Sequence, residues 1–361
     1  MPLTPLVGHQ NARRRLARAI AEGRVPQVLL LTGPAGVGKQ RLALWVAQLL
    51  VCERPGSQPC GTCRRCHLVE TLSYADVHWF VPIPRPKAAD PDKQVEEAAE
   101  SLAEVMEERR AAGRWSAPDG MATHSMASVR LLQRRAALTS VEGGPRIFII
   151  GNADRLVPQE SSPEAANALL KLLEEPPPGA YFVLTTEDPR RVLPTIRSRA
   201  VPMRLAPLPD AEVRQALEQE KRPPSAATLD ERVAHAGGSI GRALADGDDQ
   251  GAERAARELI EAVLEGPGPA LERALRQPPY QARGEFAAML DALAETLHEA
   301  ARGSLGQPVR RPVPQALLRH ASPAPLLKAL ERVGQAREAA AGNVNPQVLL
   351  AVLGEELAEV L

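Results

Sequence analysis

A glycine-rich segment near the N-terminus has the residue types that bind phosphate. Gly33, Gly36 and Gly38 are followed by Lys39, in the pattern G-x-x-x-x-G-K, between an apolar run and a helical pattern. Glycines allow consecutive backbone N–H groups to converge on phosphate oxygens, and a lysine at the start of the helix neutralises their charge. Because the motif lies in the strand–turn–helix context that it requires, we interpret it as a nucleotide site rather than a chance turn.

The residues that would hold magnesium beside those phosphates are missing. Such sites use a hydroxyl directly after the lysine and an acidic residue at the end of a buried strand. Here Gln40 follows the lysine, and the corresponding apolar run is followed by Gly151 and Asn152. We therefore predict that this chain does not hydrolyse ATP efficiently, although ATP or ADP can still bind. The alternative is that Asp154 or Glu174 supplies the acid after a local rearrangement.

All four cysteines of the chain fall within fifteen residues, at C-x7-C-x2-C-x2-C spacing: Cys52, Cys60, Cys63 and Cys66. Thiolates at this spacing wrap around one tetrahedral ion, and four of them complete a closed structural zinc site. Disulfides are disfavoured in a cytoplasmic chain. The adjacent His67 is an alternative ligand, but four sulfurs suffice. Because a closed site leaves no open coordination position, we predict a structural Zn²⁺ module at residues 52–66.

Composition limits the classes of protein to which the chain can belong. It has 361 residues with 44 basic and 44 acidic side chains, so the net charge is zero, and aromatic residues make up only 3%. Bulk charge and base stacking are therefore not expected to dominate nucleic-acid binding. The sequence has no apolar stretch of 18 residues and no signal-peptide pattern at its start. We expect a soluble, cytoplasmic protein that does not bind membranes.

Five short apolar runs, separated by helical patterns, predict the fold. They cover residues 28–31, 77–81, 146–150, 181–185 and 201–205. Buried strands that alternate with helices are typical of an α/β fold with a doubly wound parallel sheet. After Pro207 the strand signals end and helical spacing continues. One apolar stripe is interpreted as helix-packing core and consists of Phe286, Met289, Leu290, Leu293 and Leu297.

We therefore predict three parts of the chain. Residues 1–206 form a P-loop α/β domain that contains the cysteine module and a polar insert at about 82–125. Residues 207–247 form a small helical domain, and residues 248–361 form an all-α domain. The insert has six glutamates among alanines, which we interpret as the solvated face of a helix.

These residues, in this order, resemble the clamp-loader subunits of bacterial DNA polymerase III, which are AAA+ proteins, and among them the delta' subunit. The resemblance extends over nearly the whole chain and includes the phosphate loop and the four-cysteine module. Its most recognisable stretch is EAANALLKLLEEP at residues 164–176. The other similar segments are residues 7–10, 184–186, 194–200, 237–244 and 343–346.

The resemblance implies an AAA+ domain, a helical lid and a collar that joins subunits into a ring. It also implies roles for residues outside the phosphate loop. Val7 and Gln10 would contact adenine, Thr185 would be the sensor-1 residue, and Arg242 would be the sensor-2 residue. In such rings ATP lies between subunits, and an arginine of one subunit reaches the phosphate in its neighbour. Arg199 matches that position, and the alternative for this residue is a structural arginine at the end of a helix.

Departures from the family pattern distinguish among its members. Gln40, Gly151 and Asn152 remove the metal-handling groups that the gamma/tau subunits keep and that delta' subunits commonly lack. Ala200 replaces a cysteine of the family motif without removing the neighbouring arginine. We therefore predict a delta'-like subunit. The two alternatives are an active gamma/tau-type ATPase and a stand-alone nucleotide-binding module whose zinc centre contacts nucleic acid.

The resemblance also implies partners. These are the gamma/tau and delta subunits, the sliding clamp and primed DNA. Arg130 and Arg134 lie on the helix before the third strand and are candidates for contact with the DNA backbone. Solvated arginines explain these two residues equally well.

Overall fold

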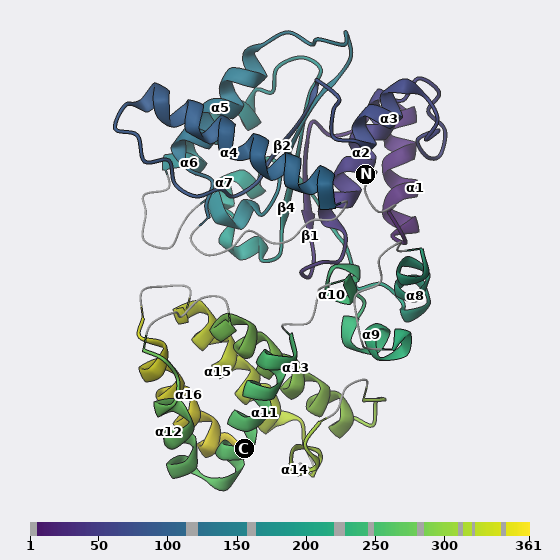
Figure 1. Ribbon diagram of the computed structural model, residues 1–361. Helices are drawn as coiled ribbons and strands as arrows, with labels where there is room; N and C mark the ends of the chain where they lie inside the picture. The colour runs from purple at the N-terminus through teal and green to yellow at the C-terminus, as the bar shows by residue number, and fades with distance from the viewer. Residues whose placement is uncertain are drawn as a thin grey trace. The chain divides into compact units, whose positions relative to one another are not determined.

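Figure 1 shows the chain as a computed structural model, which describes residues 6–112, 122–156, 164–219, 228–244, 249–279, 285–309, 313–319, 322–340 and 344–361. The chain divides into two compact units. The first comprises Met1–Lys221 with Gly238–Ala243, and the second comprises Arg222–Gly237 with Leu244–Leu361. The expected boundary at residue 247, part of the insert and Asn343 lie outside the described residues. The division into residues 1–206, 207–247 and 248–361 stays a prediction.

The first unit is built on a five-stranded parallel sheet, which confirms the expected fold class. Its strands lie in the order β2-β3-β4-β1-β5, and every paired neighbour is parallel. Their bounds are β1 Val28–Thr32, β2 Val77–Phe80, β3 Arg146–Ile150, β4 Ala180–Thr186 and β5 Val201–Arg204. The ends of the apolar runs differ from these bounds by no more than one residue, because a sheet covered on both faces needs near-continuous apolar strands.

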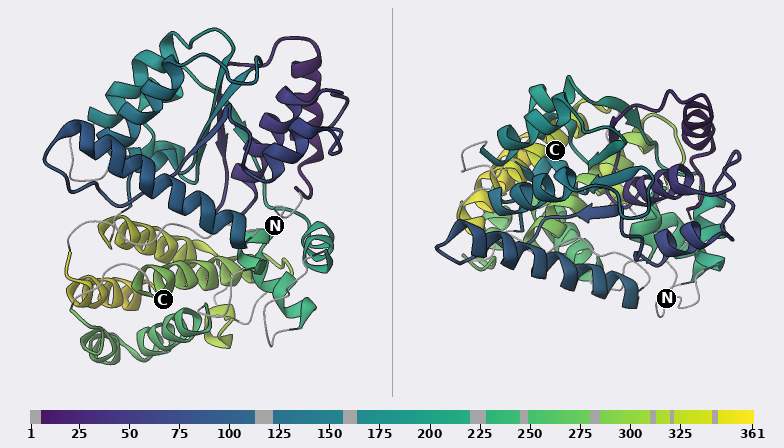
Figure 2. Two further views of the ribbon diagram at one scale, coloured as in Figure 1. Left: turned by 45° about the horizontal axis from the view of Figure 1, so that its top comes forward. Right: turned by 90° about the horizontal axis from the view of Figure 1, so that it is seen from above.

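Helices cover both faces of this sheet. In Figures 1 and 2, α1 (Gln10–Ala21), α2 (Lys39–Val51) and α3 (Arg64–Glu70) lie on one side, while α5 (Met126–Ala137) and α6 (Glu164–Glu174) lie on the other. Helix α2 is buried along nearly its whole length and contacts β1, β3 and β4. The residue directly after the phosphate-loop lysine is therefore held inside the protein and not at its surface.

The insert is a long helix anchored at both ends. Helix α4 (Pro91–Ala112) packs against α5 through an inner face that includes Val95, Ala98 and Leu102, while most of its glutamates are exposed. The backbones of Ile83 and Thr123 pair as an antiparallel bridge, with N···O distances of 3.1 and 3.0 Å. This bridge joins the two ends of the insert, and the solvated face predicted from the glutamates is confirmed.

Short elements complete the first unit. They are the 3₁₀ turns η1 (Ala153–Leu156) and η2 (Pro189–Arg191), and the helices α7 (Pro194–Arg197), α8 (Asp210–Glu218) and α10 (Ile240–Leu244). The Leu208 N–H donates to the Gly238 carbonyl at 2.9 Å. That bond joins the entry of α8 to the segment Gly238–Ala243, which belongs to the first unit although α9 (Leu229–Ala236) belongs to the second.

The regular elements of the second unit are all helices in the residues that the structure describes. Beside α9 it contains α11 (Asp249–Glu265), α12 (Pro267–Leu275), α13 (Glu285–Ser304), α14 (Gln315–Leu318), α15 (Ala324–Ala340) and α16 (Pro346–Val360). The predicted stripe on α13 is buried against α11 and α15, which confirms its interpretation as core. Across the described parts of both units, no helix combines the length and the apolar character needed to cross a membrane.

Candidate nucleotide site and metal centre

Three neighbouring strands end at the same edge of the sheet and carry the candidate nucleotide site. The phosphate loop follows β1, Gly151 and Asn152 follow β3, and Thr185 lies at the end of β4. Strand β4 is paired with β3 on one side and β1 on the other. Ligands of open α/β sheets bind outside the carboxyl ends of the strands. The sheet order therefore brings together segments that are far apart in the sequence.

The phosphate loop adopts a conformation that depends on glycine. Gly33, Gly36 and Gly38 have φ angles of 151°, 66° and 103°, a region that side chains disfavour. The Lys39 ammonium donates to the carbonyls of Gly33 and Pro34 at 2.9 and 2.6 Å. Burial lowers the pKa of Lys39, and the nearby carboxylates of Glu187 and Asp154 partly offset that effect. The lysine is thus held by its own loop in this conformation.

The segment Gly238–Ala243 packs directly on the phosphate loop. The Gly241 N–H donates to the Gly36 carbonyl at 2.9 Å, and Ser239 Oγ donates to the Ala35 carbonyl at 2.9 Å. A Cβ atom on Gly241 would lie 2.6 Å from the Gly36 Cα. Both positions therefore need glycine for this approach. Arg242, the sensor-2 candidate, is exposed and is brought next to the loop by the same segment.

An amide network occupies the place where a hydrolysing P-loop protein holds magnesium. Gln40 is 4% exposed, its Nε2 donates to Asn152 Oδ1 at 3.1 Å, and its Oε1 accepts from the Trp79 indole N–H at 3.0 Å. The Asn152 N–H in turn donates to Thr185 Oγ1 at 3.2 Å. The two amide oxygens and the threonine hydroxyl thus accept hydrogen bonds from protein groups.

Gln40 and Gly151 also depend on each other sterically. A Cβ atom on Gly151 would lie 2.4 Å from Gln40 Nε2, closer than non-bonded atoms approach. The amide group cannot swing away without losing its bonds to Trp79 and Asn152. The two departures that look independent in the sequence are therefore one structural feature, because the glutamine fills space that only a glycine leaves.

The two carboxylates considered as replacement acids have other partners. Asp154 lies in η1, is 8% exposed and accepts a hydrogen bond from Thr186 Oγ1 at 2.8 Å. Glu174 is at the end of α6 and forms an ion pair with Arg199. Asp154 is the one of the two whose charge acts on the phosphate-loop lysine.

The N-terminal candidates lie beside the loop. Val7 is buried, whereas Gln10 is exposed at the first turn of α1. Between them His9 has a φ of 54° and its Nε2 donates to the Val37 carbonyl at 2.7 Å. This bond, which the sequence pattern did not indicate, ties the start of α1 to the phosphate loop.

Arg199 follows α7 on the surface of the first unit. Its Nη1 donates to the Thr195 carbonyl at 2.9 Å and to Ser198 Oγ at 3.3 Å, and its Nη2 pairs with Glu174. The Arg199 side chain is 34% exposed. The guanidinium is therefore held in a defined direction while remaining accessible to another molecule.

The four cysteines converge into one cluster. Their sulfur atoms all lie within 4.8 Å of one another, with Cys60 and Cys66 at 3.9 Å. Zn–S bonds of about 2.3 Å in a tetrahedron place sulfurs roughly 3.8 Å apart, so the arrangement fits a closed zinc site. Backbone N–H groups of Cys60, Cys63 and Cys66 donate to neighbouring sulfurs at 3.3 to 3.4 Å. The backbone N–H groups of Thr62 and Cys63 lower the pKa of Cys60 to about 5 and favour its thiolate, whereas burial raises the pKa of Cys66. His67 is exposed and is not part of the cluster.

Both DNA-contact candidates on α5 have exposed side chains. Arg134 also forms an exposed ion pair with Asp92 at the start of the insert helix. The structure therefore places an acidic partner against one of the two arginines.

Sequence reasoning missed three residues that support this site. Trp79 joins the Gln40 amide to α4, because the Arg109 guanidinium lies 4.4 Å from the Trp79 ring centroid. His124 is buried, and its Nε2 donates to the Gly151 carbonyl at 2.7 Å. None of these contacts has a local sequence signal, since each joins elements from different parts of the chain.

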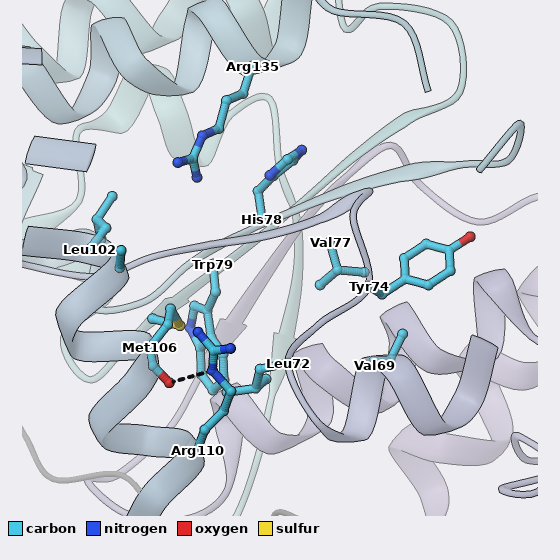
Figure 3. Close-up of a pocket in the computed structure, with 11 residues that line it drawn as sticks. Val69, Leu72, Tyr74, Val77, His78, Trp79, Leu102, Met106, Arg110 and Arg135 are labelled. Carbon is cyan, nitrogen blue, oxygen red and sulfur yellow. Dashed lines mark hydrogen bonds between the residues drawn. The ribbon is translucent and has the colours of Figure 1, made fainter. Parts of the chain in front are cut away.

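Trp79 also lines a cavity of about 200 Å³ between β2 and α4. Figure 3 shows the Trp79 ring beside Met106 and Arg110 of α4, whereas His78 and Arg135 line the cavity farther from these two residues. Burial lowers the pKa of His78 to about 4, and the charge of Arg135 adds to this effect. The cavity lies on the side of Trp79 that the insert covers, so the insert walls off this edge of the sheet.

Comparison with known proteins identifies the family. The family model for "DNA polymerase III, delta subunit" matches residues 8–209, more than half of the chain. The chain belongs to this family. Its matched part contains the phosphate loop, the cysteine cluster and Arg199.

Individual relatives agree with this assignment. DNA polymerase III subunit delta' of Bacillus subtilis is 29% identical over 59% of this chain and 53% of its own length. The delta' subunit of Escherichia coli is 29% identical over 77% of this chain and 73% of its own. The gamma/tau subunit of Mycobacterium tuberculosis is 31% identical over 56% of this chain and 28% of its own. The chain thus matches about half the length of the Bacillus subtilis relative.

A solved gamma-subunit-related protein of Thermotoga maritima covers 96% of this chain and 99% of its own, with 15% identity and a TM-score of 0.38. That score is too low to support an argument. The family assignment therefore rests on the sequence matches.

The fit between Gln40 and Gly151 can be tested in a double-mutant cycle. Gly151→Ala is expected to lower the free energy of unfolding by about 1–3 kcal/mol, because its Cβ displaces the Gln40 amide. In the Gln40→Ala background the same change should cost less, giving a coupling of about 1 kcal/mol or more.

All three tryptophans precede residue 116, so fluorescence-monitored unfolding reports on the first unit. Gly144→Ala, with no neighbour closer than 3.7 Å, is the control. Additive effects of the Gly151 and Gln40 substitutions on the free energy of unfolding would contradict the steric fit between these two residues.

Burial of His124 predicts a pH dependence of stability. Desolvation lowers the pKa of His124 to about 4 in the folded chain, against about 6.5 when unfolded. The unfolded state therefore binds this proton more tightly, and stability present above pH 6.5 is lost as the pH falls towards 4. His124→Gln should reduce the loss between pH 7 and pH 5 by about 2 kcal/mol. The exposed His298→Gln is the control, and equal pH profiles for wild type and His124→Gln would refute the assignment.

Proposed function

We propose that this chain is a delta'-type clamp-loader subunit that does not hydrolyse ATP and that completes the catalytic site of a neighbouring subunit. In this function it joins gamma/tau and delta subunits to place a sliding clamp on primed DNA. The observation that carries the proposal is the hydrogen bond from the Gln40 amide to Asn152 Oδ1, which lies where an active subunit needs its metal ligands.

The network supports loss of hydrolysis for two reasons. Neither Gln40 nor Asn152 carries a negative charge, and a magnesium ion beside phosphates needs hard anionic or hydroxyl oxygens in near-octahedral geometry. The amide oxygens of both residues already accept bonds from Trp79 and Gln40. This argues against the alternative of an active gamma/tau-type ATPase.

Nucleotide binding without hydrolysis remains part of the proposal. The glycine conformations of the phosphate loop suit phosphate, and Lys39 would exchange its carbonyl partners for phosphate oxygens. Val7 and Gln10 would contact the adenine, with Thr185 and Arg242 as sensors of the phosphate end. ATP or ADP would then have a structural role, because Gln40 and Asn152 supply no charged ligand for a magnesium ion.

Arg199 is the group proposed to act on the neighbour. A guanidinium supplied in trans stabilises charge that develops on a transferred phosphoryl group. Glu174 and the Thr195 carbonyl hold Arg199 in a defined direction, which reduces the entropy lost when it meets a phosphate. The exposed third of its side chain is what an adjacent subunit would contact.

The second unit supports assembly with other subunits. Its helices α12 and α16 pack together and expose the large apolar residues Leu271, Leu275, Val348 and Val352, each about half exposed or more. Exposed apolar residues at i, i+4 spacing on two adjacent helices are typical of an interface with another helical protein. We propose that a neighbouring clamp-loader subunit covers this face.

Steady-state ATP hydrolysis tests the proposal directly. The chain alone is expected to show no turnover, while a mixture with gamma/tau and delta subunits and primed DNA should hydrolyse ATP. Arg199→Ala should slow the one site that it faces by about 10³-fold and leave the other sites of the loader active. The loader would therefore lose the share of turnover that this site contributes.

Two variants serve as controls for this experiment. Arg197→Ala, an exposed arginine of α7, should leave loader turnover unchanged. Gln40→Thr should not restore turnover to the isolated chain, because Gly151 and Asn152 still supply no acid. Robust hydrolysis by the isolated wild-type chain would overturn the proposal, and full loader activity with Arg199→Ala would remove the role of that residue.

We propose that the cysteine cluster holds one structural Zn²⁺. Metal analysis of protein prepared under reducing conditions should find about one zinc per chain. Cys66→Ser removes a buried ligand and should lower both the zinc content and the stability of the α3 region, whereas His67→Ala should keep the metal. Zinc-free wild-type protein that retains its folded state would show that the site is not a zinc site.

A further inference from the structure

The positive charge of this neutral chain is concentrated in its first part. Residues 6–69 contain nine arginines and one lysine but only two acidic residues, Glu22 and Glu53. The remaining residues carry the compensating excess of negative charge. An occupied tetrathiolate zinc centre would lower the positive excess by about two charges and would not reverse it.

The basic segment folds into one connected region, formed by α1, α2 and the cysteine module. Arg13 connects its parts, since its guanidinium lies 5.3 Å from the Trp45 ring of α2 and donates to Gln58 Oε1 at 3.4 Å. In Figures 1 and 2, α1 and the chain around α3 lie together at the same side of the first unit. The arginines of α1 and of the cysteine module thus belong to the same packed region of the first unit.

Helix α1 presents arginines to solvent. Arg14, Arg15 and Arg18 are exposed and lie on one face of the helix, opposite the buried Leu16 and Ala17. Arg18 pairs with Glu22 at 2.8 Å, and Arg14 donates to Asn11 at 2.5 Å. Such exposed contacts contribute little free energy and exchange readily for phosphate oxygens. Arg54 and Arg64 of the cysteine module are also exposed, with Arg64 paired to Glu142.

We propose that Arg14, Arg15 and Arg18, with the arginines of the adjacent cysteine module, bind the phosphate backbone of duplex DNA. The choice of DNA rests on the proposed function, whereas the requirement for a polyanion rests on the charge. Guanidinium groups match phosphate oxygens in geometry, and backbone contacts carry no sequence information. This surface is distinct from the phosphate loop and from Arg130 and Arg134 on α5.

The region has the chemistry of a nucleic-acid surface rather than of a protein interface. Among its described residues, none of the large apolar side chains is exposed, and Trp45 is buried beneath Arg13. The cores of protein interfaces are depleted of charged residues and enriched in aromatic side chains. Base stacking likewise needs an exposed aromatic ring. Backbone phosphate is the ligand that such a surface fits.

The test is binding of the full chain to a labelled 30-base-pair duplex, measured by fluorescence anisotropy between 50 and 200 mM salt without nucleotide or other subunits. The plot of log Kobs against log salt concentration has a slope of about −0.9 for each phosphate contact. The triple variant Arg14→Gln, Arg15→Gln, Arg18→Gln should therefore reduce the steepness by up to about 2.7 and weaken binding at least about tenfold at 50 mM salt. The corresponding Arg→Lys triple variant should retain most of the slope.

Two further variants identify which surface binds. Arg254→Gln, Arg257→Gln, Arg276→Gln removes the same charge from exposed positions of the second unit and should not change binding. Equal loss in this control, unchanged binding in the α1 variant, or loss confined to an Arg130→Gln, Arg134→Gln variant would each overturn the proposal. Because no loader is present, this experiment is independent of assembly: failure of the chain to assemble with gamma/tau would contradict the proposed function, whereas only the duplex-binding results decide this inference.

Discussion

The hydrogen bonds of the Gln40 amide are the interaction on which the character of the nucleotide site depends. They join three elements, since the amide contacts Trp79 at the edge strand and Asn152 beyond β3 from the second position of α2. A buried amide left without partners would cost about 1–3 kcal/mol for each group. The residues of the network therefore depend on one another, because replacing one of them by a metal-binding residue removes a hydrogen-bond partner from another.

The phosphate loop is also held by contacts within the protein that do not involve a nucleotide. Gly36 is required by the close approach of Gly241, in addition to any requirement for phosphate. Lys39 is bonded to two carbonyls of its own loop. The loop thus contributes to the packing of the first unit, and this contribution preserves its shape independently of hydrolysis.

The insert helix is connected to this site although it lies outside the α/β core. Arg109 of α4 lies against the face of Trp79, and the indole N–H of that residue bonds to Gln40. A displacement of α4 would therefore disturb the contacts of Gln40 at the start of α2. The pairing of Ile83 with Thr123 limits such displacement, because it holds the two ends of the insert together.

The sequence by itself determined the strands, the cysteine cluster and the residue types of the phosphate loop, because each depends on neighbours along the chain. Apolar runs predict buried strands, and cysteines at x2 spacing can reach one point without help from distant segments. Tertiary structure alone decided the contacts of Gln40, which lies 112 residues from Asn152. The strand order places the end of β3 near the start of α2, and no local pattern encodes that order. For the same reason, only the fold could show that Glu174 holds Arg199 and that Asp92 pairs with Arg134.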